Sequence, residues 1–99
     1  MPDFDHNQID DLIHSRLRLA IMAVLASVDR AEFGFVRDQV RATDGNLGAH
    51  LRKLEAAGYV RLEKSFVDRK PRTQCTLTQT GRAALRAYVE KLAQMVVAT

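Results

Sequence analysis

The spacing of apolar residues changes at Gly58, and this change limits the folds open to the chain more than any other feature. Before it, Leu47, Leu51 and Leu54 follow one another at steps of four and three residues, which place them on one face of a helix. After it, apolar and polar side chains alternate over residues 60–66, as is typical of a strand. Glycine readily adopts the left-handed conformation that ends many helices. The sequence therefore predicts a helix that leads through Gly58 directly into a strand.

The first part of the chain is predicted to be helical in the same way. Apolar residues recur at steps of three and four from Ile9 to Val28, which predicts a helix that is capped by Asn7 and ends near Ser27. A short extended piece at residues 32–34 and a two-turn helix that ends near Arg41 are expected to follow.

The polar residues between these segments predict how the remaining elements begin. Thr43 is expected to cap the next helix by accepting the N–H three residues on, with Asp44 either at the cap or paired with a neighbouring cation. Two short helices separated by about three residues form a helix-turn-helix arrangement. Residues 68–71 (DRKP) are typical of a turn before a return strand over residues 72–77. Thr78 is expected to cap a last helix over residues 79–97.

The expected fold class is therefore mainly α with a small β-hairpin, an α+β fold. Its order is helix, short strand, helix, helix, strand, strand, helix. A chain of 99 residues is long enough for one domain. We expect that domain to span residues 1–99, with residues 1–8 as a flexible acidic N-terminus.

Charge and composition favour a protein that binds a polyanion over an enzyme. The net charge of +3 is uneven, because residues 1–14 hold four Asp and no Lys or Arg. The positive charge therefore lies in the rest of the chain, which suits a nucleic-acid partner. The sequence has neither a Gly-rich phosphate-binding loop nor a Gly-x-Ser-x-Gly motif. We expect no enzymatic activity.

The same survey predicts a cytoplasmic protein without a membrane partner, metal or cofactor. The longest apolar run, residues 19–26, is far shorter than the ~18 residues that cross a bilayer, and the acidic N-terminus does not resemble a signal peptide. A single cysteine, Cys75, excludes an internal disulfide, and its position predicts a buried, inert thiol, with redox sensing as the alternative. His6, His14 and His50 are too scattered for a metal site within one chain.

Two motifs resemble those of winged-helix transcriptional regulators of the broad MarR/ArsR type. Residues 47–60 (LGAHLRKLEAAGYV) are similar to the recognition helix of that superfamily and the first strand of its wing. Residues 77–82 (LTQTGR) look like the junction between the wing and the last helix, and residues 14–21 (HSRLRLAI) resemble the first helix of small single-domain members. The resemblance implies a homodimer on a partly palindromic operator. Each recognition helix would enter a major groove, and each wing (the hairpin of residues 60–77) would reach the adjacent backbone or minor groove.

Candidate DNA contacts lie on the recognition helix and the wing. Asn46 can pair with adenine, and His50 or Lys53 can donate to guanine or to a phosphate. Arg69 at the wing tip suits a narrow A·T minor groove. The whole set is Thr43, Gly45, Asn46, His50, Arg52, Lys53, Lys64, Arg69, Lys70 and Arg72. Plainer roles stay open: Asn46 could serve the helix cap, Gly45 could merely be tolerated, and the cations could form a solvated face.

The first and last helices are expected to form the dimer interface. Overlapping apolar seams along the last helix are too broad for the wing base to cover, so a second subunit is expected to cover the rest. The alternative is that the last helix folds back on the first helix of its own chain. An effector, if one exists, would enter at this interface. The interface set is Ile9, Leu12, Ile13, Leu85, Tyr88, Val89, Leu92, Met95 and Val96.

The expected function is that of a sequence-specific regulator that represses transcription. Two other classes of function remain as alternatives. A winged-helix module that binds only proteins would favour a neutral or acidic recognition face, which this sequence lacks. A protein that coats nucleic acid without sequence preference would lose affinity with rising salt as a regulator does. It would not bind one DNA sequence more tightly than others, as a regulator does.

Overall fold

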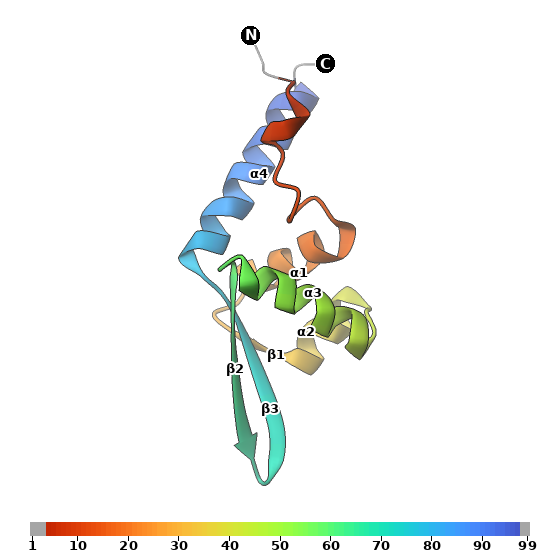
Figure 1. Ribbon diagram of the computed structural model, residues 1–99, viewed down its shortest axis with the longest axis vertical. Coiled ribbons are helices and arrows are strands. Elements are labelled where there is room, and N and C mark those ends of the chain that lie inside the picture. The colour runs from red at the N-terminus through yellow and green to blue at the C-terminus, as the bar shows by residue number, and fades with distance from the viewer. Residues whose placement is uncertain (1–3, 98–99) are drawn as a thin grey trace.

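The computed structural model describes residues 4–97 and has the predicted order of elements (Figure 1). The elements are η1 (His6–Gln8), α1 (Arg16–Ala26), β1 (Ala31–Glu32), α2 (Phe33–Val40), α3 (Asp44–Ala56), β2 (Val60–Val67), β3 (Lys70–Leu77) and α4 (Gln79–Val97). The first three α-helices form the body of the molecule, from which the wing and α4 project in different directions. The predicted α+β fold is confirmed.

The sheet supports only the base of the wing. Strand β3 lies between β1 and β2, and both pairings are antiparallel. Strand β1 reaches only Gln74 and Cys75, so the outer wing is a free two-stranded ribbon. Val60 is buried at the base, whereas Phe66, which shares its face of β2, is 76% exposed. The tip of the wing therefore extends beyond the core into solvent.

The core joins α1 to α3 and to the base of the wing. Leu47, Leu51 and Leu54 are buried, as their spacing predicts. They belong to one apolar cluster with Ile21 and Leu25 of α1. Truncating a leucine at such a site to alanine costs about 2–5 kcal/mol, so this cluster sets how firmly α3 is held.

The junction between α3, the wing and α4 is a close backbone contact. Gly58 has φ of 79° and ends α3, and the Thr78 hydroxyl donates to its carbonyl at 2.6 Å. The Thr78 N–H donates to the Tyr59 carbonyl at 3.0 Å, and Thr78 Oγ1 accepts the Gly81 N–H at 2.9 Å. The predicted cap at Thr78 is confirmed. A Cβ on Gly81 would overlap the Tyr59 carbonyl oxygen, so α4 starts where only glycine fits.

The prediction of a first helix beginning near Ile9 with Asn7 as its cap is wrong. Asp10 Oδ1 accepts the backbone N–H groups of Leu12 and Ile13 at 2.9 and 3.3 Å, which gives this segment a turn in place of a helix. Helix α1 begins only at Arg16, after Ser15 in an extended conformation. The apolar spacing continued through this segment because Ile9 and Leu12 are half-buried and Ile13 is buried.

Two smaller boundaries also differ from the prediction. The extended piece is β1 (Ala31–Glu32), and α2 already begins at Phe33. The turn of the wing is formed by Asp68 and Arg69 alone, with φ of 51° and 67°. Positive φ at both central residues matches the twist of a two-residue hairpin. Pro71 therefore lies within β3, where the absence of β1 leaves that edge unpaired and a missing N–H is tolerated.

Helix α4 makes the molecule long. The extents are 57 × 24 × 21 Å and the radius of gyration is 15.0 Å, against about 13 Å for a compact chain of this size. The segment of residues 9–14 packs against α4, where the Tyr88 hydroxyl lies 2.9 Å from His14 Nδ1. Ile13 and Tyr88 are consequently buried within one chain, at 0% and 5% exposure. The predicted flexible N-terminus lies partly outside the described residues.

Within residues 4–97, no helix combines the length and the apolar character needed to cross a membrane.

We expect Gly81→Ala to lower the free energy of unfolding by about 1–3 kcal/mol, because the new Cβ pushes α4 away from the Tyr59 carbonyl. Urea unfolding at constant m-value measures this. The matched control is Gly45→Ala, whose Cβ would meet nothing within 4 Å, and which should leave stability unchanged or raise it. A Gly81→Ala midpoint equal to that of the wild type would show that the contact is not a constraint.

Candidate nucleic-acid interface

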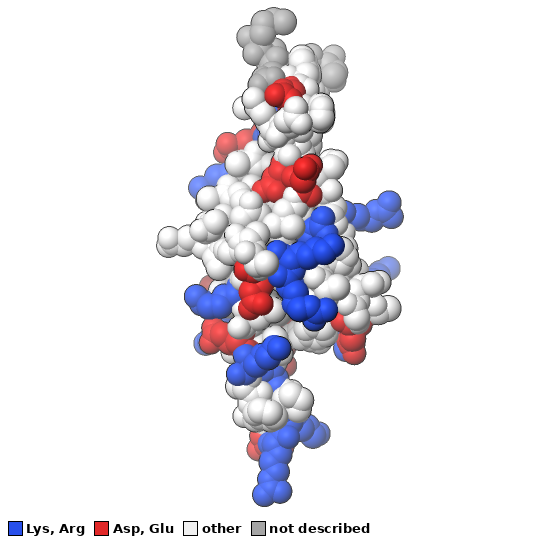
Figure 2. Space-filling view, viewed as in Figure 1, with Lys and Arg blue, Asp and Glu red and all other residues white. Residues whose placement is uncertain are grey.

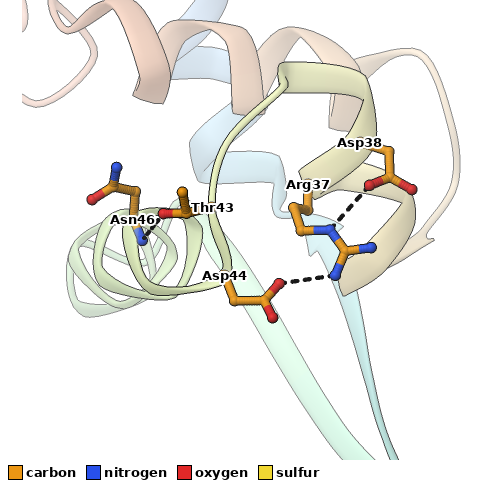
Figure 3. A network of polar contacts seen from close by, with 5 residues as sticks. All are labelled: Arg37, Asp38, Thr43, Asp44 and Asn46. Atoms are coloured by element: carbon orange, nitrogen blue, oxygen red, sulfur yellow. Dashed lines mark hydrogen bonds and ion pairs between the residues drawn. The ribbon is translucent and has the colours of Figure 1, made fainter.

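The N-terminus of α3 is fixed by a cap and an ion-pair network (Figure 3). Thr43 Oγ1 accepts the Asn46 N–H at 3.1 Å, so the predicted cap is confirmed. Arg37 of α2 donates to Asp44 at 2.9 Å and to Asp38 at 3.0 Å, and these two bonds raise the pKa of Arg37 above its usual value. Asp44 is thus paired with a cation, one of the two predicted roles. The Asn46 side chain points away from this network and stays exposed.

The outer surface of α3 carries a polar strip beside a shallow face. Asn46, His50 and Lys53 follow at steps of four and three, so they lie along one side of the helix. The neighbouring face holds Gly45 and Ala49, and a Cβ on Gly45 would meet open space. No packing contact within the chain therefore requires glycine at position 45.

His50 is held from α1 rather than pointing freely into solvent. Arg18 NH1 lies 2.9 Å from His50 Nδ1, and Arg18 Nε donates to the Leu12 carbonyl. Burial, followed by the positive charges of Arg18 and Lys53, lowers the pKa of His50 below 6.5. Sequence reasoning missed Arg18, although a cation next to the apolar run from Leu19 to Ala26 is a signal that could have drawn attention to it.

The cations of the wing differ in their solvent exposure and in their ion pairs. Lys64, Arg69 and Lys70 are exposed, whereas Arg72 is half-buried. Arg72 Nε forms an ion pair with Glu32 Oε1 of β1 at 2.8 Å, a partner that sequence reasoning missed. Arg72 therefore lies against the body with part of its charge balanced, while the cations nearer the tip face solvent.

A groove separates α3 from the wing. Its volume is about 580 Å³, with Gly48 and Arg52 on the helix side and Lys64 on the wing side. A second groove of about 630 Å³ runs between the N-terminus of α2 and the outer wing, where Arg37 and Lys70 line it. Cations line both grooves beside acidic side chains, which are Asp44 and Glu55 in the first and Glu32, Asp44 and Asp68 in the second, so the lining of each groove is mixed in charge.

Figure 2 shows how these charges are distributed over one face. Lys and Arg side chains gather over the middle of the molecule, where α3 lies in Figure 1, and again at the tip of the wing. Acidic side chains appear on the part farthest from the wing, where the N-terminal segment lies, and also beside the cations over the middle of the molecule. The positive charge over α3 is therefore interspersed with carboxylates, whereas the tip of the wing lies at the end opposite the N-terminal segment.

The remaining reactive groups are inert or isolated. Cys75 is fully buried, and this burial raises the pKa of its thiol to about 11, so the thiol stays protonated near neutral pH. Among residues 4–97, no three His, Cys, Asp or Glu side chains come together as ligands for a metal ion.

Comparison with known proteins gives similar folds and sequences. A family model described as a winged helix DNA-binding domain matches residues 17–96. An uncharacterized protein of Methanocaldococcus jannaschii is 33% identical over 84 residues, which are 85% of this chain and 91% of that protein. The structure of a transcriptional regulator homologue from Pyrococcus horikoshii OT3 superposes with a TM-score of 0.82 at 30% identity, covering 88% of this chain and 86% of that one. A MarR-family regulator from Silicibacter pomeroyi gives a TM-score of 0.63 at 27% identity, over 85% of this chain and 56% of that one.

We expect the stability of the protein to fall as the pH decreases below 6.5, in part because of His50. The lowered pKa means that the unfolded chain binds a proton at this residue before the folded chain does, so the contribution of His50 is complete above pH 6.5 and is lost as the pH falls toward the lowered value. Urea unfolding at about pH 7.5 and about pH 5.5 measures the loss. His50→Gln should reduce the difference between the two pH values, and an identical difference in both proteins would contradict the prediction.

Proposed function

Because the chain belongs to the family of winged helix DNA-binding domains, we propose that it is a transcriptional repressor that binds, as a homodimer, a partly palindromic operator in double-stranded DNA. The observation that carries this proposal is the pairing of a polar strip on α3 with exposed cations on the wing across a groove. DNA recognition needs both parts, since base edges are read by side chains on a helix and phosphates are bound by cations around it.

The residues divide between reading bases and binding the backbone. Asn46, whose side-chain amide is not used by the cap, pairs with an adenine in the major groove. Arg52 and Lys64 line opposite walls of the groove and bind phosphates there, together with Lys53. The free backbone at Gly45 and the Thr43 cap support a phosphate at the N-terminus of α3.

The wing contributes the second part of the contact. Arg69 enters the minor groove next to the half-site, where a narrow A·T-rich groove strengthens the negative potential. Lys70 binds the adjacent backbone. Arg72 contributes less than the tip residues, because Glu32 already balances its charge.

The dimer forms through α4 and the segment before α1. Val89 and Val96 are 53% and 69% exposed along α4, beside half-buried Leu85 and Leu92. Met95, Ile9 and Leu12 are also half-buried and extend this apolar surface. Ile13 and Tyr88 support it from beneath, since they are buried in their own chain. A two-fold axis through such an interface separates the half-sites by about one helical turn.

The protein represses transcription because its occupancy of the operator blocks the polymerase. Since it acts on DNA, it is located in the cytoplasm. A small-molecule effector, if there is one, would act at the interface between residues 9–14 and α4, where a ligand alters the spacing of the two recognition helices. The residues described are accounted for by DNA-binding and dimer elements, and none of them carries a catalytic role in this proposal.

Selection of binders from a random duplex DNA library at near-physiological salt tests the proposal. We expect an enriched two-fold symmetric motif with half-sites one turn apart. Recovery of DNA without a motif would support non-specific coating, since the electrostatic contribution to affinity is common to both functions. No recovery would support a winged-helix module that binds proteins.

Arg69→Ala should weaken binding to the selected operator by about 1.5–3 kcal/mol, the contribution of a hydrogen bond to a charged group. It should also relax the preference for A·T pairs in the flanks, and fluorescence anisotropy with matched flanks measures both effects. The control on the same hairpin is Arg61→Ala, since Arg61 is engaged with Glu63 at 3.3 Å and should matter less. Unchanged affinity of Arg69→Ala on A·T-rich flanks would remove the wing tip from the interface.

Val89→Glu should give monomers and abolish operator binding, because a carboxylate in an apolar interface costs more than the interface gains. Val89 is half-exposed in a single chain, so the monomer should remain folded. Light scattering gives the mass, and circular dichroism checks the fold. The control, Ala87→Glu, lies two residues away on an exposed side of α4 and should remain a dimer. A Val89→Glu dimer that binds the operator normally would place the interface elsewhere.

A further inference from the structure

The contact between Arg18 and His50 determines which nitrogen of the imidazole carries the proton. Arg18 NH1 lies 2.9 Å from His50 Nδ1. A guanidinium has only donors and keeps its charge at any physiological pH. His50 Nδ1 must therefore act as the acceptor, without a proton, and a neutral imidazole then carries its single proton on Nε2.

Arg18 is itself anchored, so the contact is not that of two free surface side chains. Its Nε donates to the Leu12 carbonyl, which lies in the turn held by Asp10. Arg18 and His50 are both half-buried. The charged groups facing the imidazole are Arg18 from α1 and Lys53 from α3, and both are positive, so both favour the neutral ring.

The second nitrogen of His50 points to solvent. His50 Nε2 has no hydrogen-bond partner among the described residues, and it is not one of the buried side-chain atoms that lack such a partner there, so it is accessible to solvent. His50 shares its strip with Asn46 and Lys53, the side of α3 assigned to the major groove. The ring thus offers DNA one N–H donor and no acceptor.

We propose that Arg18 is a positioning residue that fixes His50 as an Nε2–H donor, and that His50 thereby selects guanine at one position of each half-site. This inference rests on the proposed function. Guanine presents two adjacent acceptors, O6 and N7, on its major-groove edge, whereas thymine presents one, O4, beside its bulky C5-methyl group. Cytosine presents a donor that a lone N–H opposes, and adenine presents a donor beside its N7. Arg18 touches no DNA in this arrangement; it acts through the tautomer of His50.

Nitrogen-15 NMR of the histidine side chains tests the positioning step on the free protein. The wild type should have His50 protonated on Nε2 and unprotonated on Nδ1 at neutral pH. Arg18→Met should convert this to a mixture of both tautomers, while Arg16→Met, which removes an exposed cation from the same helix, should leave the single tautomer unchanged. A wild-type His50 protonated on Nδ1, or an Arg18→Met protein with the wild-type tautomer, would overturn the inference.

Selection from the random library tests the reading step with the same variants. The wild type and Arg16→Met should prefer guanine over other bases at one position by at least about tenfold. Arg18→Met should reduce this preference to less than about threefold at that position only, with the rest of the motif retained, whereas a protein that merely unfolds loses the whole motif. His50→Gln should shift the same position toward adenine, because an amide offers both a donor and an acceptor.

The outcomes separate this inference from the function on which it rests. A wild-type motif that Arg18→Met reproduces in full overturns the role of Arg18 and leaves the repressor intact. A wild type that enriches no motif overturns the proposed function and guanine reading with it, while the NMR result still decides whether Arg18 fixes the tautomer. If Arg18→Met fails to fold, Arg18→Gln takes its place. The glutamine side chain is too short to reach His50, but it keeps a polar group near Leu12.

Discussion

The contact between Gly81 and the Tyr59 carbonyl is the constraint on which the rest of the structure depends. Here the end of α3, the first strand of the wing and the start of α4 come together. Thr78 joins them through three hydrogen bonds, which it makes with Gly58, Tyr59 and Gly81. Helices α3 and α4 consequently leave the same corner in fixed directions. In a protein that reads two half-sites at once, the angle between these helices sets the distance between the two recognition helices of a dimer.

The turn of residues 10–14 connects the same corner to α3 and to α4. Asp10 accepts a hydrogen bond from the Tyr59 hydroxyl at 2.6 Å, which raises the pKa of Tyr59 to about 12 and keeps it a donor. His14 contacts Tyr88 of α4, and the Leu12 carbonyl holds Arg18 against His50 of α3. A short segment without helical structure therefore contacts α4 through His14 and reaches α3 through the side chain of Arg18. A ligand that moved it would act on both helices together.

The local elements were predictable where the sequence carries a local cause. Thr43 and Thr78 cap helices because their hydroxyls reach an N–H three residues on, and Gly58 ends α3 because it tolerates positive φ. The start of α1 was not predictable from apolar spacing, because the apolar side chains Ile9, Leu12 and Ile13 face the core from a turn just as they would from a helix. The turn of the wing was predicted to start at the right residue but to be too long, since Pro71 signals a turn locally but lies in a strand whose neighbouring edge is unpaired.

The sequence by itself determined the order of elements, the buried face of α3 and the residue types on its outer face, because periodicity and capping act over a few neighbouring residues. Only the tertiary structure decided which polar groups are free to act. Arg72 is balanced by Glu32, Asp44 by Arg37, and His50 is oriented by Arg18, a residue 32 positions away in the chain. These pairings join different elements, and their geometry exists only after the helices and the wing have packed, so no local pattern records them.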